Sequence, residues 1–354
     1  GTMLYEHGVF INACYDELCL TRPELVRRIH RAYVQAGADV IETNSFGANP
    51  VKLREHGLAE KTAQINRAAV RLARECADET VYVAGAVGPC LRPGQLWNAR
   101  RADALEAAFT AQIRALTAEG VDLILLETFV HIDELRLAAA VAHACGVPVA
   151  ASFTTGFSGE TALGRDVADV CTDLDRDDNV DLIGLNCGVG PAPLYDVLER
   201  ILPLTDKPIL VMPNAGSPRE VDGRMIYLTS PEYFTTYAKR FIKLGARGVG
   251  GCCGTTPEHI REAARTVKSL SGVKKHVAIK AYAPESVEVS PVPPAEKSRL
   301  ASRICRGETV SSVELLPPRS SDLTSLLEKA RQCHYAGVDA INIPDGPRAS
   351  GTRQ

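Results

Sequence analysis

The sequence predicts an α/β protein built on a (β/α)8 barrel of the TIM type, and repeated strand patterns lead to this prediction. In four segments a helical stretch ends at a small residue, and a short apolar strand then ends at a polar residue: 36–44, 119–128, 179–187 and 244–253. Three more apolar runs lie between them, at residues 81–88, 147–154 and 208–214. Such nearly continuous apolar strands are typical of a parallel sheet buried on both faces.

Polar residues at the ends of so many strands favour a closed barrel over an open sheet, because barrel active sites lie at the carboxyl ends of the strands. The first strand is not followed by a GxGxxG motif, which counts against a dinucleotide-binding open sheet. Seven strands are found where a barrel needs eight. We expect the first strand to precede residue 1, so that this chain lacks it.

Two helix starts can be predicted from their capping residues. Thr21 with Glu24 matches a capping box, and Thr256 directly precedes Pro257, a favoured first-turn residue.

The chain is expected to contain a barrel at residues 1–271, a linker rich in Pro and Glu at 272–300, and a second α/β unit that begins at 301–354. In this last part, residues 308–319 and 336–345 read as two strands on either side of a helix. Two strands and one helix are too few to bury a core alone, so this part belongs to a larger unit or packs on the barrel.

Composition restricts the partners. The 354 residues are 45% hydrophobic and 23% charged, with a net charge of -3 and no run of Lys or Arg. This pattern indicates neither a nucleic-acid partner nor a membrane surface, and no segment reaches the roughly 18 apolar residues of a membrane span. The N-terminus lacks the pattern of a signal peptide, so we expect a cytoplasmic enzyme that acts on small molecules.

The cysteines indicate a reducing compartment, since there are eleven of them at irregular spacing. Most are expected to be inert because no second ligand lies at a suitable spacing; these are Cys14, Cys19, Cys76, Cys145, Cys171 and Cys333. For Cys90, at the end of another strand, we expect packing rather than ligation.

Three other cysteines predict a metal site. Cys252 and Cys253 lie among glycines in GGCCGTTPEH (250–259), where the backbone can turn and direct both sulfurs to one point. A disulfide between these neighbours is disfavoured, since their Cα atoms are about 3.8 Å apart and ordinary disulfides need roughly 4.4 Å. Cys187, at the end of GLNC, supplies a third thiolate, while His259 is expected to cap the helix or face solvent. Three thiolates make an open zinc site with one position free.

These residues resemble a known family, the zinc-dependent homocysteine S-methyltransferases. The resemblance covers residues 1 to about 270 and rests on five segments: ETNSFGAN (42–49), LLETF (125–129), GLNC (184–187), PNAG (213–216) and GGCCGTTPEHI (250–260). It implies methyl transfer to homocysteine, giving methionine, with Cys187, Cys252 and Cys253 as zinc ligands and Asn214 as a further candidate ligand. It also implies that Glu127 holds the substrate amino group and that Asn44 and Phe46 line the pocket.

The chain departs from the family at its start, because it begins just after the glycine-rich turn that normally carries an aspartate. Its tail shows a second resemblance, since SVELLPPR (312–319) is similar to the opening strand of 5,10-methylenetetrahydrofolate reductases. There Glu314 would be a proton donor, and the two resemblances together imply a bifunctional enzyme. FAD binding and folate reduction are expected only when the full reductase domain is present.

Several alternatives remain open at this point. Glu127 could pair with an arginine, Asn214 could form a turn, and Glu314 could be an exposed carboxylate at a strand end. The zinc could be structural, in a scaffold or regulatory module for the reductase, or Cys252 and Cys253 could form a redox pair. The methyl donor is a sulfonium compound by preference, over betaine or a methylated folate or cobalamin.

Overall fold

The computed structural model describes residues 1–10, 12–92, 94–95, 97–217, 219–221, 224–269, 293–316 and 323–342. It divides into two compact units, Gly1–Ala278 and Ile279–Gln354. Residues 272–292 of the predicted linker lie outside the described residues.

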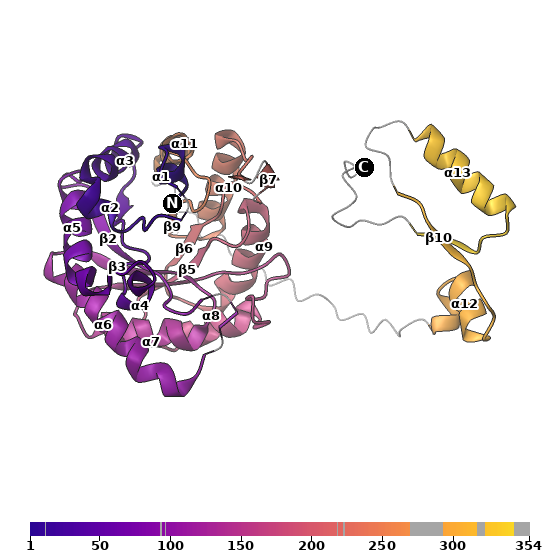
Figure 1. Ribbon diagram of the computed structural model, residues 1–354, viewed down its shortest axis with the longest axis horizontal. Helices are drawn as coiled ribbons and strands as arrows, with labels where there is room; N and C mark the ends of the chain where they lie inside the picture. The colour runs from indigo at the N-terminus through magenta and orange to yellow at the C-terminus, as the bar shows by residue number, and fades with distance from the viewer. Residues whose placement is uncertain are drawn as a thin grey trace. The chain divides into compact units, whose positions relative to one another are not determined.

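A curled sheet of seven parallel strands forms the centre of the first unit, in the order β1-β2-β3-β4-β5-β6-β9 (Figure 1). Its strands are β1 (Val40–Glu42), β2 (Tyr82–Val87), β3 (Leu123–Phe129), β4 (Val149–Phe153), β5 (Leu182–Asn186), β6 (Ile209–Met212) and β9 (Gly248–Val249). Six of these strands lie within predicted segments, and β3 extends one residue beyond its segment, to Phe129. The predicted fold class is therefore confirmed, because a curled parallel sheet with a helix after nearly every strand is the architecture of a TIM-type barrel.

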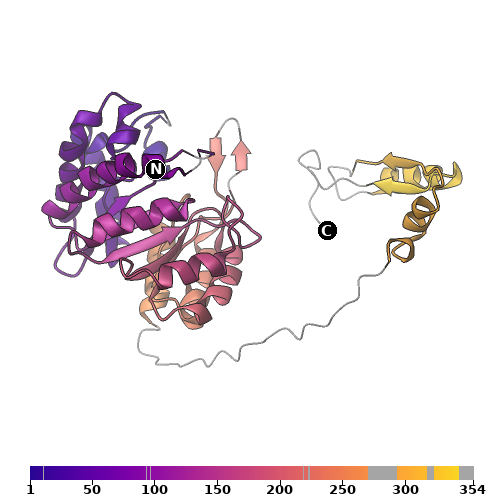
Figure 2. The same ribbon diagram turned by 90° about the horizontal axis from the view of Figure 1, so that it is seen from below.

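Helices surround the outer face of this sheet (Figure 1). They are α1 (Thr2–Glu6), α2 (Leu18–Thr21), α3 (Pro23–Gln35), α4 (Pro50–Arg54), α5 (Thr62–Arg74), α6 (Ala102–Ala118), α7 (Ile132–His143), α8 (Val167–Asp175), α9 (Pro191–Ile201), α10 (Pro231–Leu244) and α11 (Pro257–Lys268). Three short 3-10 turns accompany them, at Ala59–Lys61, Ala99–Arg101 and Leu202–Leu204. Between β6 and α10 the chain also forms an antiparallel hairpin, β7 (Arg219–Val221) with β8 (Arg224–Ile226), which the sequence analysis did not anticipate (Figure 2).

The main core lies between the sheet and its helices and contains the fully buried rings of Phe109, Phe129 and Phe153. Burial of each ring contributes about 1.5–3 kcal/mol. A smaller cluster on the other face of the sheet is formed by Ala84, Leu125, Ala150 and Met212. Because both faces are filled, the strands are fixed in register and the loops after them are held at one end of the barrel.

The two predicted helix starts have different outcomes. Thr256 is the N-cap of α11 with Pro257 in the first turn, and its N–H donates to Nδ1 of His259. The prediction for Thr21 is wrong, because Thr21 ends α2 and donates its hydroxyl to the carbonyl of Glu17. Helix α3 begins at Pro23, so Thr21 lies one position too early to cap it.

The second unit contains a strand–helix–strand arrangement, with β10 (Ser312–Glu314), α13 (Thr324–Tyr335) and β11 (Ala340–Asn342). The two strands pair in parallel, as the yellow arrows of Figure 2 show. A turn at Pro294–Glu296 and α12 (Arg299–Cys305) precede them. No described residue of this unit is fully buried, and large apolar side chains such as Leu316, Leu327 and Tyr335 are exposed.

In the described part of the chain, no helix has the length and apolar character needed to cross a bilayer.

Candidate functional site

Three cysteine thiols meet at the carboxyl ends of β5 and β9. The sulfur atoms of Cys187, Cys252 and Cys253 all lie within 4.8 Å of one another, and those of Cys187 and Cys253 are 3.9 Å apart. Zn–S bonds of about 2.3 Å at tetrahedral angles place two sulfurs roughly 3.8 Å apart. The spacing and the donor type therefore fit a tetrahedral thiolate-preferring metal ion.

The backbone around Cys187 is turned so that its thiol can reach this point. Cys187 has a φ of 58°, in the left-handed region, and Gly188 follows with a φ of 71°. A Cβ atom on Gly188 would lie 2.3 Å from the carbonyl oxygen of Thr155, so a larger residue has no room. The N–H of Cys187 donates to the carbonyl of Met212 at 3.1 Å, which fixes the turn against β6.

The adjacent cysteines are held by the loop that follows β6. Cys252 donates its N–H to the carbonyl of Pro213 at 2.8 Å, and Cys253 donates its N–H to Oδ1 of Asn214 at 3.1 Å. Gly254, with a φ of 78°, then leads the chain away toward α11. Both thiols can therefore face the same point although they are neighbours in sequence.

The protonation states of the three thiols depend on one another. Hydrogen bonds with Cys187 and Cys252 lower the pKa of the Cys253 thiol to about 2, whereas hydrogen bonds with Cys187 and Cys253 raise the pKa of Cys252. Three clustered thiolates repel one another, so full deprotonation of this site requires a cation.

Glu127, in β3, lies near the thiols and is half-buried. Burial raises the pKa of its carboxyl group, and the nearby Glu42 carboxylate raises it further. Burial also raises the pKa of Glu42, at the end of β1, to about 7. Among the described residues neither carboxylate forms a salt bridge with an arginine, but the N-terminal ammonium group lies close enough to both to lower their pKa values in part. Two neighbouring half-buried carboxylates that already attract the N-terminal ammonium form a suitable site for the ammonium group of a ligand.

Asn186 connects β3 with the thiols. Its side-chain oxygen accepts the N–H of Thr128 at 2.8 Å, and its amide donates to the hydroxyl of Thr128 at 2.8 Å. The same amide lies 4.0 Å from the sulfur of Cys252. Since Thr128 follows Glu127 and Asn186 precedes Cys187, this pair of hydrogen bonds fixes the carboxylate relative to the thiols.

The loop after β1 carries the two predicted pocket residues. The amide of Asn44 donates to the carbonyl of Tyr15 at 2.7 Å, which makes it part of the loop framework. The ring of Phe46 is 42% exposed and lies against Gly88, where a Cβ atom would come within 2.4 Å of it. Asp16 fixes this loop by accepting the N–H of Gly47 at 3.0 Å, and burial raises the pKa of Asp16 to about 6.

The remaining predicted residues are not members of the thiol cluster. Cys90 is buried in the main core, as expected for a packing role, and its N–H donates to Glu134. Glu314 is an exposed residue of β10 in the second unit. His259 caps α11 as expected but is buried rather than solvent-facing.

Sequence reasoning missed four residues of this site: Glu42, Asn186, Asp16 and Tyr227. Glu42 and Asn186 had a visible signal, because each is a polar residue at the end of a predicted strand. Asp16 and Tyr227 had none, since their roles depend on contacts with distant segments; Tyr227 lies close enough to Cys253 for the two groups to interact electrostatically.

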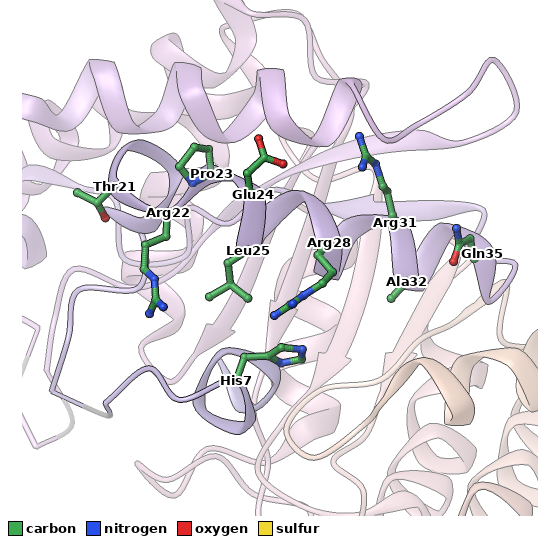
Figure 3. Close-up of a pocket in the computed structure, with 10 residues that line it drawn as sticks. All are labelled: His7, Thr21, Arg22, Pro23, Glu24, Leu25, Arg28, Arg31, Ala32 and Gln35. Carbon is green, nitrogen blue, oxygen red and sulfur yellow. The ribbon is translucent and has the colours of Figure 1, made fainter.

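Two of the grooves at the surface of the first unit can be compared with the position of the thiols. The larger, of about 860 Å³, runs along α3 and is lined by His7, Arg22, Arg28 and Arg31 among others, with no predicted site residue (Figure 3). The smaller, of about 470 Å³, is lined by Gly190, Gly216 and Thr229, in loops after β5 and β6. The smaller groove is thus the one on the side of the barrel that carries the thiols.

Comparison with known proteins identifies relatives of the first unit. Residues 1–267 match the family model described as homocysteine S-methyltransferase. Methionine synthase from Mycobacterium tuberculosis is 33% identical over 280 residues, which are 75% of this chain and 23% of that protein. The corresponding protein from Mycobacterium leprae is 33% identical over 270 residues, or 73% of this chain and 22% of that protein. The chain thus spans less than a quarter of the length of these two relatives.

A solved structure supports the same assignment. The crystal structure of the homocysteine methyltransferase MmuM from Escherichia coli, in its metallated form, superposes with a TM-score of 0.63 at 26% identity. The match covers 75% of this chain and 92% of that chain. With a matching family model over three quarters of its length and these relatives, the chain belongs to the homocysteine S-methyltransferase family.

Proposed function

We propose that this protein transfers a methyl group to the thiol of homocysteine, giving methionine, at a zinc ion held by Cys187, Cys252 and Cys253. The observation that carries the proposal is the convergence of the three sulfurs within 4.8 Å. Family membership supports the reaction, and the sulfur donors support zinc, since thiolates prefer soft or borderline metals over magnesium or calcium.

Glu127 is proposed to bind the ammonium group of the substrate. Its carboxylate lies near the thiols, so an amino acid with a thiol at the far end could place its sulfur at the metal and its ammonium at Glu127. Asn44 and Phe46 are proposed to line the pocket. Asn214 is the candidate for a fourth ligand when substrate is absent, although in the described arrangement its Oδ1 accepts the N–H of Cys253.

In the proposed reaction the homocysteine sulfur forms a bond to the methyl carbon while the bond from that carbon to the donor breaks. A free thiol with a pKa near 8.5 is only about 3% ionised at pH 7, and a bound zinc ion supplies the Lewis acidity that removes its proton. Full ionisation of the thiol raises the reaction rate by at most roughly 30-fold. The gain in rate is smaller if the metal-bound thiolate is a weaker nucleophile than the free one. Glu127 and the fixed strand ends must supply the rest of the rate acceleration, by aligning the sulfur, the methyl carbon and the leaving group.

A sulfonium compound is the preferred methyl donor. The net charge of -3 and the carboxylates at the strand ends are compatible with a small cationic donor. A screen of S-adenosylmethionine, S-methylmethionine, betaine and methyl folate would identify the donor by methionine formation.

X-ray absorption at the zinc edge, with and without homocysteine, tests the metal-centred part of the proposal. We expect a change from three sulfurs and one lighter atom to four sulfurs when homocysteine binds. An unchanged set of zinc ligands would show that the substrate thiol does not reach the metal, and it would favour a structural zinc. Absence of bound zinc together with a reducible disulfide between Cys252 and Cys253 would instead favour a redox pair.

For the rest of the chain, we propose that residues 1–271 form the methyltransferase domain, 272–300 a linker and 301–354 the start of a methylenetetrahydrofolate reductase-like barrel. The parallel strand–helix–strand arrangement of β10, α13 and β11 supports this, with Glu314 as the proposed proton donor. A longer protein with the complete reductase domain would then bind FAD, which its flavin absorbance would show. Cytoplasmic location is proposed as well, because all eleven cysteines are free.

A further inference from the structure

The groove along α3 has an excess of positive charge. Its volume is about 860 Å³, and its basic lining residues are His7, Arg22, Arg28 and Arg31 (Figure 3). The acidic side chain among the lining residues, Glu24, already forms an ion pair with Arg27. Because the chain as a whole has a net charge of -3, this positive surface is a local feature and not a property of the whole protein.

Two of these arginines have no partner of their own. In the described part of the chain, the side chains of Arg22 and Arg28 form neither an ion pair nor a hydrogen bond. Other arginines on the barrel helices are paired, for example Arg71 with Glu119 and Arg74 with Asp122. An arginine presents five N–H donors in a planar fork that fits a carboxylate or a phosphate group. The donors of Arg22 and Arg28 are therefore available to an anionic ligand.

The shape of the groove lets both arginines act on one ligand. Arg22 is the N-cap of α3 and Arg28 lies six positions further on, a rise of roughly 9 Å along a helix. Figure 3 shows that both side chains extend from α3 toward the side on which His7 lies, with the buried Leu25 between them. Nδ1 of His7 donates to the carbonyl of Met3 at 2.8 Å, so Nε2 remains for a ligand and becomes a donor when the ring is protonated.

Both walls of the groove also contact the loop that carries the paired cysteines. The hydroxyl of Thr2, at the start of α1, accepts the N–H of Gly254 at 3.2 Å. The phenol of Tyr33, in α3, donates to the carbonyl of Thr255 at 2.8 Å. Since His7 follows the last residue of α1, this helix of five residues reaches from the groove to the cysteine loop. Such a short helix has little stability of its own, so a ligand that joins it to α3 would hold it in place.

We propose that this groove is a binding site for a small molecule with two or more phosphate or carboxylate groups. Arg22 and Arg28 bind the anionic groups, Leu25 contacts the body of the molecule, and the bound ligand fixes α1 against α3. A volume of about 860 Å³ lies in the range of small-molecule sites, roughly 300–1,000 Å³. The inference goes beyond the proposed methyl transfer and depends neither on the metal nor on homocysteine.

The test is calorimetry with two probes, fructose 1,6-bisphosphate and the dicarboxylate suberate, on the whole chain at low salt. We expect the wild type to bind at least one probe with one molecule per chain. Arg22→Gln/Arg28→Gln should weaken this binding by about tenfold or more, because charge-assisted hydrogen bonds are lost. Binding of the bisphosphate alone would identify the ligand as a phosphate compound, and binding of suberate alone would identify it as a polycarboxylate.

Arg100→Gln/Arg101→Gln is the matched control. It removes the same two positive charges from exposed positions in the 3-10 turn Ala99–Arg101, which does not line the groove. We expect this variant to keep the wild-type affinity within about twofold. An equal loss in both double variants would show only a general attraction of anions to the protein and would overturn the inference. Failure of the wild type to bind either probe at millimolar concentration would overturn it as well.

Hydrogen exchange of the wild-type protein tests the role of α1 without any substitution. With a saturating probe, the amides of residues 2–7 and 252–255 should exchange more slowly, because α1 is held against α3 and the cysteine loop is supported. Binding of the probe without this protection would refute the bridging of α1 and α3. Loss of zinc binding or of methyl transfer would not alter these results, so the proposed function and this inference can fail separately.

Discussion

Replacement of Asp16 by asparagine should stabilise the protein at neutral pH, although Asp16 makes a hydrogen bond in the native structure. Burial raises the pKa of its carboxyl group from an ordinary 3.8 to about 6. The folded protein therefore binds the proton more tightly than the unfolded chain does. The stability that this proton provides is complete below about pH 4 and is lost as the pH rises through about 6.

The magnitude follows from the difference of about two pKa units, each worth about 1.4 kcal/mol, which gives at most about 3 kcal/mol at pH 7. Asparagine carries no charge and keeps an oxygen that can accept the N–H of Gly47. Asp16→Asn should therefore gain up to this amount in free energy of unfolding above pH 6 and nothing near pH 4.

Urea unfolding followed by circular dichroism, at several pH values between about 4 and 8, measures this difference. Both proteins are compared without metal, so that loss of metal at low pH does not enter. Asp206→Asn, at an exposed position between the 3-10 turn Leu202–Leu204 and β6, serves as the control and should show no such pH dependence. A variant that is less stable than the wild type at pH 7.5, or a difference that does not change with pH, would refute the reasoning.

Three further predictions concern the site. Glu127→Gln should weaken homocysteine binding about tenfold to 100-fold by calorimetry, and should leave binding of an analogue without the amino group unchanged; equal losses for both ligands would contradict an ammonium contact. Gly188→Ala should lower the free energy of unfolding by at least about 3 kcal/mol, through backbone strain and the clash with Thr155. Gly146→Ala, with a φ of 74° and no atom within 4 Å, should cost only about 1 kcal/mol, and a similar loss in both would argue against the clash. Removal of zinc by a chelator should speed amide hydrogen exchange in Gly248–Val249 more than in β2, and uniform protection would show that the metal does not support β9.

The strands were predictable from the sequence because they are buried on both faces. Each of the seven strands lies in an apolar run, four of these segments end at a polar residue, and this pattern needs no knowledge of the remainder of the fold. The hairpin of β7 and β8 was missed, because REV and RMI are only three residues long and each begins with an arginine. The capping prediction at Thr21 failed because α2, a helix of four residues, ends where α3 was expected to begin.

The thiol cluster was predictable for a related reason. Cys187 and the Cys252–Cys253 pair each end a strand pattern, and parallel strands bring such ends together at one edge. Asp16 and Tyr227 could not be found in this way. Their importance comes from contacts with Gly47 and Cys253, which lie 31 and 26 positions away in the sequence, and nothing in their immediate neighbours indicates those contacts.

The strand β9 is only two residues long and pairs with β6 at Leu210 and Val211. The few backbone hydrogen bonds of such a short pairing contribute little to the stability of β9. A metal ion bound to Cys187 and to Cys252–Cys253 would link the end of β5 to the end of β9, across β6, which lies between them in the sheet. The ligands that prepare the substrate for reaction would then also fasten the last strand of the sheet to the body of the protein.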